Sequence, residues 1–136
     1  MKLTLPSIQD QQAAIFQAAT DTAIKQLRAN LKAPRLPAQT AIDESTLPRT
    51  HLLREAEGWE APDPAIVRAY FRHFQDAFPE YDTDARLAKL LGLSSDRRVR
   101  EFKEGRRKVP YELWRKFLVI TGRAPQDVLP VLAFMA

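Results

Sequence analysis

The sequence predicts an all-α protein with five to seven helices. No segment shows the sustained alternation of apolar and polar residues between turn signals that is typical of strands. Instead, apolar residues recur at three- and four-residue steps, and proline, glycine or capping residues stand at the ends of these segments. The chain has 136 residues, of which 45% are hydrophobic and 28% charged, a composition that predicts one folded domain with an extension.

The first predicted helix is long and amphipathic. The segment from Ser7 to Lys32 contains no proline or glycine, and its apolar residues recur mostly at helical spacing: Ile8, Ile15, Phe16, Ala19, Ala23, Ile24, Leu27 and Leu31. A single narrow apolar stripe cannot be buried by one helix alone. We therefore expect this helix to dock on the rest of the chain or on a second copy.

A proline-containing segment separates this helix from the rest of the chain. Residues 33–50 carry three prolines among polar residues, a composition typical of a linker or extended chain. Residues 51–61 predict a short helix ending near Gly58, with Trp59 as a packing anchor. The sequence thus predicts an N-terminal arm at residues 1–50, for dimerisation or docking, and one folded domain at residues 51–136 that includes a C-terminal apolar segment.

Clear start and stop signals bound the next two predicted helices. Asp63 and Pro64 predict a helix start, because aspartate caps free amides and proline is tolerated in the first turn. That helix has an apolar face and ends before Pro79; the face comprises Ile66, Val67, Tyr70, Phe71, Phe74 and Phe78. The following helix is capped by Asp82 or Thr83 and ends at Gly92, with Leu87, Ala88, Leu90 and Leu91 as its apolar side.

Two more helices and an apolar end complete the prediction. One helix begins at the capping residues 94–96 and ends at Gly105, with Val99 and Phe102 facing inward. The other begins near Pro110 and closes at Gly122, with Leu113, Trp114, Phe117, Leu118 and Ile120 as its apolar residues. For residues 125–136 we expect a kink at Pro130 or a helix that starts there.

Positive charge is concentrated in one third of the chain. Residues 86–123 hold 12 basic and 4 acidic residues, a local charge of +8, whereas the whole chain carries +4. The remaining residues therefore carry a net charge of −4. This asymmetry predicts that residues 86–123 meet a polyanion.

The composition argues against several other classes of protein. There is no cysteine, the two histidines lie in unrelated segments, and no phosphate-binding loop or nucleophile elbow is present. The acidic pairs Asp82 with Asp84 and Glu101 with Glu104 are better explained by helix capping and charge balance than by catalysis. We therefore expect no enzymatic activity, no metal and no cofactor. Without an apolar run of about 18 residues or a secretion signal, we also expect no membrane association and a cytoplasmic, nucleoid-associated location.

The order of these elements resembles the lambda-repressor-like (XRE or Cro type) helix-turn-helix family. The resemblance covers roughly residues 64–122 and rests on residues 87–94, on Val99-x-x-Phe102-x-x-Gly105, and on Val109-Pro110 with the helix that follows. Between Gly92 and Val99 the turn, or the start of the third helix, is one residue longer than the common family pattern. The resemblance implies a helical bundle whose third helix enters the major groove of DNA.

The resemblance also implies the roles of individual residues. In such proteins the start of the third helix meets base edges, which here gives Ser95, Asp96, Arg97, Arg98 and Arg100 as base-reading candidates. Arg97 and Arg98 rank above Arg100, and Asp96 either caps the helix or orients an arginine. The candidates for phosphate contact are Lys89, Ser94, Lys103, Arg106, Arg107 and Lys108.

We expect a sequence-specific regulator that binds double-stranded DNA, most simply a repressor of a phage, plasmid or mobile element. The expected assembly is a homodimer, because the stripe at residues 15–31 and the apolar segment 128–135 lack partners in the sequence pattern and such regulators pair two half-sites. The alternative is a protein-interaction factor on the same fold, an antitoxin or phage-borne inhibitor. Its protein partner would then bind through residues 7–32.

Overall fold

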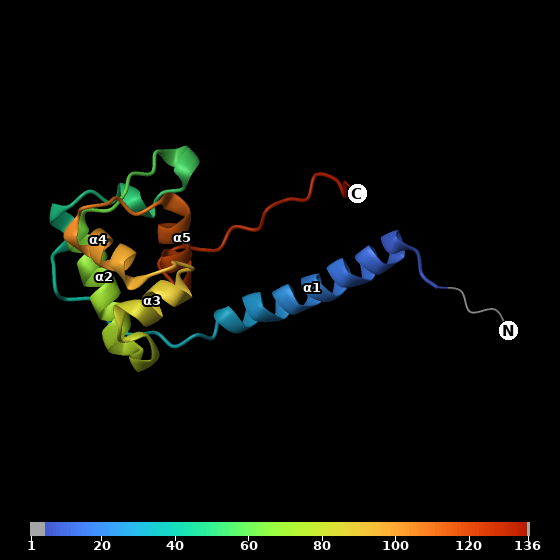
Figure 1. The fold of residues 1–136 in the computed structure, drawn as a ribbon, viewed down its shortest axis with the longest axis horizontal. Helices are drawn as coiled ribbons and strands as arrows, with labels where there is room; N and C mark the ends of the chain where they lie inside the picture. Colours follow the sequence, from blue (N-terminus) through green and yellow to red (C-terminus); the bar gives the residue numbers. More distant parts are fainter. Residues whose placement is uncertain (1–4, 136) are drawn as a thin grey trace. The chain divides into compact units, whose positions relative to one another are not determined.

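The computed structural model describes residues 5–135, which form two compact units divided between Ala38 and Gln39 (Figure 1). Over this described range the chain contains five α-helices, several short 3-10 turns and no strand. The prediction of an all-α protein with five to seven helices is therefore confirmed.

The first unit contains one long helix, α1 (Ile8–Asn30). Ser7 caps it, because its hydroxyl accepts a hydrogen bond of 3.1 Å from the backbone amide of Asp10. None of the helix residues is buried, and Ile8, Ile15 and Ile24 are exposed. The predicted helix at residues 7–32 is confirmed to within two residues at its ends.

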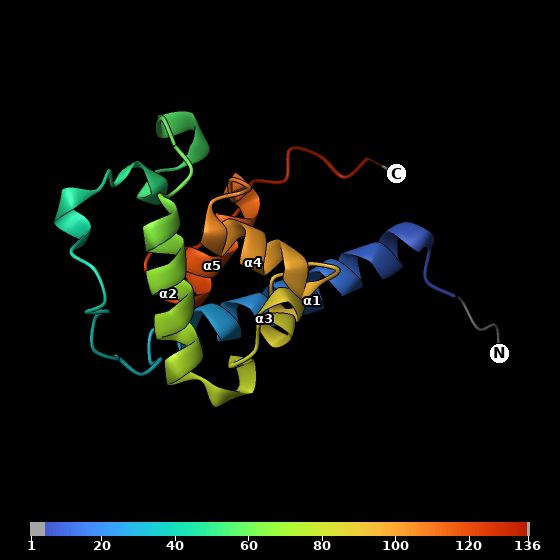
Figure 2. The same cartoon turned by 60° about the vertical axis from the view of Figure 1, so that its left-hand side comes forward.

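The second unit is a bundle of four helices: α2 (Pro64–Ala77), α3 (Asp84–Leu90), α4 (Asp96–Glu104) and α5 (Tyr111–Ile120). Figure 2 shows α4 beside both α2 and α3, the two helices with which it shares most contacts. Their apolar faces form one core: Ile66, Val67, Tyr70, Phe71, Phe74, Leu87, Ala88, Leu91, Val99, Phe102, Val109, Trp114, Phe117 and Leu118. This core fixes the direction in which each helix presents its outer face.

Aromatic rings account for the centre of this core. Trp114 of α5 is fully buried and stacks on Tyr70 of α2, with ring centroids 5.7 Å apart and an interplanar angle of 11°. Phe117 packs edge-on against Phe71 at 4.9 Å. The aromatic face predicted for residues 66–78 is thus core, as expected from its spacing, and it joins α2 to α5.

The segment that precedes α2 packs on the bundle, although its sequence resembles a linker. Residues 39–58 contain three 3-10 turns, Glu44–Thr46, Thr50–Leu52 and Glu55–Glu57, and the last ends at Gly58 with a φ of 99°. The predicted short helix at residues 51–61 is thus two 3-10 turns. The division at Ala38 and Gln39 also lies before the predicted boundary at residue 50, because Ile42 and Leu47 pack against the core.

Buried polar contacts hold this segment, which we call the strap (residues 39–58). His51 is 1% exposed, and its Nδ1 accepts a hydrogen bond of 3.1 Å from Trp114 Nε1. The phenol of Tyr70 donates to the carboxylate of Glu44. Trp59 donates from Nε1 to the His51 carbonyl at 3.1 Å and packs on Tyr111, which confirms its predicted role as a packing anchor.

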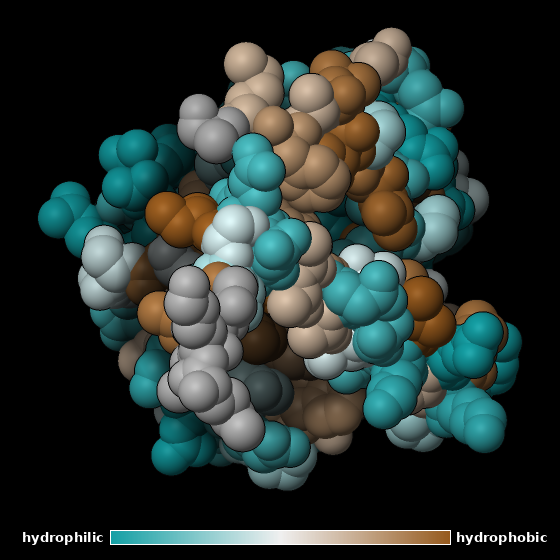
Figure 3. Space-filling view, turned by 90° about the vertical axis from the view of Figure 1, so that its right-hand side faces the viewer, coloured by the Kyte–Doolittle hydropathy of each residue, from teal (hydrophilic) through white to brown (hydrophobic). Residues whose placement is uncertain are grey.

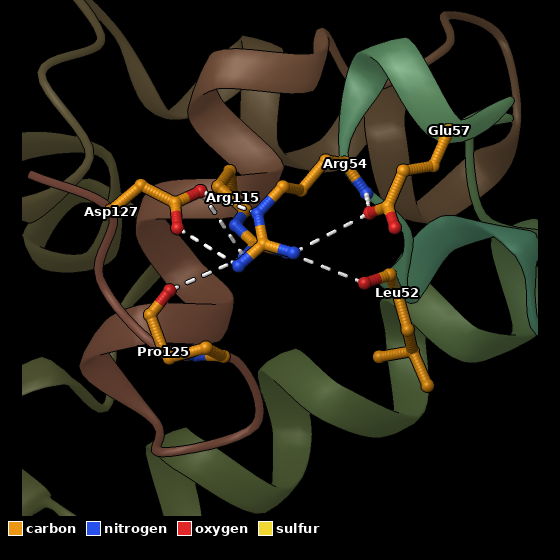
Figure 4. Close-up of polar contacts among 6 residues, drawn as sticks. All are labelled: Leu52, Arg54, Glu57, Arg115, Pro125 and Asp127. Atoms are coloured by element: carbon orange, nitrogen blue, oxygen red, sulfur yellow. Dashed lines mark hydrogen bonds and ion pairs between the residues drawn. The ribbon is translucent and has the colours of Figure 1, made fainter. Parts of the chain in front are cut away.

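The segment after α5 is extended, so the helix starting at Pro130, one of the two alternatives considered for this segment, is absent from the described residues. A bidentate pair anchors its beginning: Arg54 of the strap binds Asp127 through Nε at 2.8 Å and Nη2 at 2.9 Å (Figure 4). Arg115 of α5 donates to the carbonyls of Leu52 and Pro125. Beyond Asp127 the side chains at positions 128, 129, 131, 132, 134 and 135 are exposed, so no core contact supports a helix there.

Exposed apolar side chains are concentrated in α1 and in residues 128–135. Figure 3 shows brown, apolar residues among teal, hydrophilic ones on one face of the molecule. Exposed apolar surface of this kind is typical of segments that bind another molecule.

Candidate nucleic-acid interface

Helices α3 and α4 are joined by a short turn and pack against each other. Thr83 caps α3, with its hydroxyl accepting from the amide of Arg86 at 3.2 Å. Gly92 ends the helix with a φ of 77°, and the amide of Leu93 donates to the Ala88 carbonyl at 2.8 Å. The predicted roles of Thr83 and Gly92 are confirmed, and the turn directs the chain into α4.

The inner side of α4 is fixed by two buried residues. Val99 and Phe102 are 0% and 1% exposed, as the sequence predicted. Successive helical residues are about 100° apart, so Arg97 lies about 170° from the centre of this inner side and Arg100 about 130° from it. Arg98 and Lys103 lie at about 70°, on the flanks. The side chain of Arg97 is accordingly 81% exposed.

The start of α4 has a different capping arrangement from the one expected. Ser95 occupies the N-cap position in an extended conformation, but its side chain makes no capping hydrogen bond. Asp96 instead binds Arg100 one turn later, with Oδ2 and Nη1 2.7 Å apart. Two roles were considered for Asp96, capping the helix and orienting an arginine. Its contact with Arg100 fits the second role. Ser94 is exposed in the turn before the helix.

The carboxylate of Glu101 lies close to three of the arginines that were predicted to contact DNA. Glu101 lies 3.1 Å from Nε of Arg97, 2.9 Å from Nε of Arg107 and 3.9 Å from Nε of Arg98. Desolvation is the largest single influence on the pKa of Glu101, and by itself it would raise this pKa. The hydrogen bond from Arg107 and the positive charges of the surrounding arginines together have a larger, opposite effect, so the pKa of Glu101 lies below its usual value. Glu101 is therefore charged near neutral pH, within the basic cluster.

Lys103 differs from the other proposed phosphate contacts because it is held within the bundle. Its Nζ lies 2.6 Å from Oδ1 of Asp84 on α3, and its side chain is only 24% exposed. Its carbonyl also accepts a 2.7 Å hydrogen bond from Arg68 of α2. Lys89 on α3, by contrast, is exposed. The Lys103 to Asp84 pair joins α3 to α4.

The basic loop that follows α4 is fixed by a glycine. Gly105 has a φ of 76°, and a Cβ atom there would lie 2.8 Å from Cγ of Pro64 at the start of α2. Arg106, Arg107 and Lys108 follow directly and are exposed. Arg106 is paired with Glu104 at 2.9 Å and Arg107 with Glu101. The close contact at Gly105 thus places three cations at the end of α4.

The charge balance predicted for Glu101 is confirmed by its contacts with three arginines. Sequence reasoning missed two other participants in this surface, Asp84, which pairs with Lys103, and Arg68, which donates to the Lys103 carbonyl. A helical projection would have placed Glu101 one turn after Arg97, on the same side of the helix. The contacts of Asp84 and Arg68 with α4 depend on how separate helices pack, which sequence spacing does not indicate.

No ligand cluster for a metal, formed by three or more His, Cys, Asp or Glu residues, occurs in the described part of the chain. Among residues 5–135, no helix is both long and apolar enough to cross a bilayer. The chain matches no family model, no curated protein and no solved structure.

Proposed function

We propose that the protein is a sequence-specific regulator that binds double-stranded DNA by inserting α4 into the major groove. One observation carries the proposal: α4 is pinned on its inner side by Val99 and Phe102, and its outer side presents Arg97 and Arg100 to solvent. The helix is followed directly by three exposed basic residues. A pinned helix with outward arginines is the geometry by which such proteins reach base edges.

The arginines supply a chemistry that fits guanine. The planar guanidinium presents parallel N–H donors that match the O6 and N7 acceptors of guanine, the commonest specific contact in the major groove. Arg97 and Arg100 are our primary base-reading residues because they lie on the outer side of α4. Arg98, on the flank, is placed to reach the edge of the groove or the nearer phosphates, with Ser95 and Asp96 at the entering end.

Other cations would hold the helix against the backbone of DNA. Lys89, Arg106, Arg107 and Lys108 are exposed on either side of α4 in the sequence. Contacts with phosphates fix the register of a protein on DNA without reading its sequence. Lys103 contributes less to this role because Asp84 already engages its ammonium group.

We also propose that the partner of α1 is a second copy of the chain, paired antiparallel. Ile15 and Ala23 lie four residues on either side of Ala19, the midpoint of α1, and about 80° apart around the helix axis, so both are on the same side of the helix. Antiparallel pairing would bring Asp10, near the start of one helix, close to Arg28, near the end of the other. A parallel pair would instead place like charges side by side. A homodimer would present two α4 helices to two half-sites.

The second candidate is a protein-interaction factor, and the exposed α1 favours it. A helix of 23 residues with no buried side chain is well suited to bind a different protein. As an antitoxin or inhibitor, such a factor would need α1 for its activity and would not need the arginines of α4. Replacing Arg97 and Arg100 by alanine therefore separates the two candidates, because a regulator would lose its activity and an interaction factor would keep it.

Selection of bound sequences from a random DNA pool tests the proposed function directly. A regulator should enrich a defined site, whereas an interaction factor should enrich none. On the selected duplex, Arg97→Ala should cost about 1 to 3 kcal/mol and relax the preference at one base pair. Arg106→Ala should weaken selected and scrambled duplexes alike. Equal losses on both duplexes for Arg97→Ala and Arg100→Ala would contradict base reading by α4.

A further inference from the structure

We propose that Glu101 is a specificity-determining residue that positions the arginines of α4 for base reading and opposes binding to DNA of any sequence. The proposal rests on the proposed function, because it assigns Glu101 a role in the same groove contact. It starts from the three guanidinium groups that surround this one carboxylate.

The contacts of Glu101 are distributed over both of its oxygens. Oε1 lies 3.1 Å from Nε of Arg97, and Oε2 lies 2.9 Å from Nε of Arg107 and 3.9 Å from Nε of Arg98. The Glu101 side chain is only 16% exposed. The carboxylate thus links the outer side of α4 to the basic loop that follows the helix.

The atoms used by each arginine determine what the contact does. Arg97 and Arg107 approach Glu101 with Nε, the donor nearest the aliphatic stem, so their terminal Nη1 and Nη2 groups remain available. Those terminal groups form the fork that binds O6 and N7 of guanine or two phosphate oxygens. Arg97 can therefore keep its contact with Glu101 while it reads a base. The carboxylate limits the rotation of the guanidinium plane and reduces the entropy lost on binding.

The same carboxylate disfavours binding without a base contact. A negative charge beside the groove-facing arginines repels phosphates, and it competes with phosphate oxygens for the same cations. On a correct site the contact of Arg97 with guanine compensates for this repulsion. On an incorrect site no such contact forms, so the repulsion remains uncompensated. Glu101 should thus widen the difference between selected and random DNA.

Glu104 provides a matched control on the same helix. It contacts Arg106, with Oε2 and Nε 2.9 Å apart, and its side chain is 50% exposed. Glu104→Gln and Glu101→Gln remove the same charge from neighbouring turns of α4 and keep the shape of the side chain. Only Glu101→Gln removes the support of Arg97.

The experiment measures Kd for wild type and both variants on the selected duplex and on a scrambled duplex of equal length. Both variants should bind the scrambled duplex more tightly, since each gains one unit of positive charge. Only Glu101→Gln should lower the ratio of selected to scrambled affinity, by at least about fivefold. That is the smallest discrimination expected of one base-reading arginine. An unchanged ratio in Glu101→Gln, or an equal fall in both variants, would overturn the proposal.

A second measurement needs no DNA. In wild type, exchange of the Nε–H protons of Arg97 and Arg107 with water, followed by NMR, should be slower than in Glu101→Gln. Glu104→Gln should leave both rates unchanged. Equal exchange rates in wild type and Glu101→Gln would show that the carboxylate does not position these arginines. A wild-type protein that prefers no sequence would instead overturn the proposed function and the role of Glu101 with it, whatever the exchange rates.

Discussion

Replacing Gly105 by alanine should destabilise the second unit much more than the same change at Gly92. Both glycines end helices with nearly equal positive φ, 76° and 77°, so both variants carry the cost of a left-handed alanine. That cost is about 1 to 2 kcal/mol. Around Gly92 no atom lies within 4 Å of the added Cβ, whereas at Gly105 it would lie 2.8 Å from Cγ and 3.3 Å from Cβ of Pro64.

The difference between the two variants measures the packing of Gly105 on α2. The ring of Pro64 cannot rotate away like a flexible side chain, so α2 or the end of α4 has to move. Overpacking of this kind costs typically about 1 to 3 kcal/mol. We therefore expect losses of about 1 to 2 kcal/mol for Gly92→Ala and about 2 to 5 kcal/mol for Gly105→Ala.

Urea unfolding at 25 °C, followed by the fluorescence of Trp59 and Trp114, gives the free energy of unfolding of each variant. Adding Pro64→Ala to Gly105→Ala should recover part of the lost free energy of unfolding, because it removes the nearer ring atom, Cγ. The double-mutant cycle then gives the coupling energy between positions 64 and 105. Losses for Gly92→Ala and Gly105→Ala that agree within about 0.5 kcal/mol would refute the reasoning. So would the absence of coupling between positions 64 and 105.

Three further predictions concern pH, assembly and salt. Desolvation, helped by the charge of Arg49, lowers the pKa of His51 to about 4. Below about pH 6.5, His51 is therefore protonated in the unfolded chain but stays neutral in the folded one. The free energy of unfolding should fall by up to about 3 kcal/mol between pH 7 and pH 4. His51→Gln should flatten this dependence, and an unchanged slope would exclude His51 as its cause. Because the chain has no cysteine, Ile15→Cys and Ala23→Cys can be cross-linked selectively. Antiparallel α1 pairs should cross-link when the two variants are mixed, whereas cross-linking within each variant alone would indicate parallel pairing. Arg106→Ala should lower the slope of log Kd against log salt concentration by about one unit, and an unchanged slope would show that Arg106 does not contact phosphate.

Local signals predicted the helices well because each signal acts within one turn. The start of α2 follows from Asp63 and Pro64, and the ends of α3 and α4 follow from Gly92 and Gly105. The inward direction of Val99 and Phe102 follows from their three-residue spacing. These elements also position α4, so the helix that carries the candidate site could be predicted from the sequence.

The strap could not be predicted because its order depends on distant partners. His51 is buried through contacts with Trp114, 63 positions later, and Arg54 binds a residue 73 positions away. Prolines and polar residues look alike in a packed strap and in a linker. The contact of Arg107 with Glu101 could not be predicted for a related reason, since Arg107 reaches this carboxylate only after Gly105 turns the chain.

The long-range contacts of the strap also determine an order of events during synthesis. Residues 39–58 leave the ribosome early, but the indole that bonds to His51 and the carboxylate that binds Arg54 belong to residues 114 and 127. The strap therefore cannot form these contacts until α5 and the segment after it have left the ribosome. The nascent chain can assemble α2, α3 and α4 first, through contacts close in sequence, and close the strap over them last.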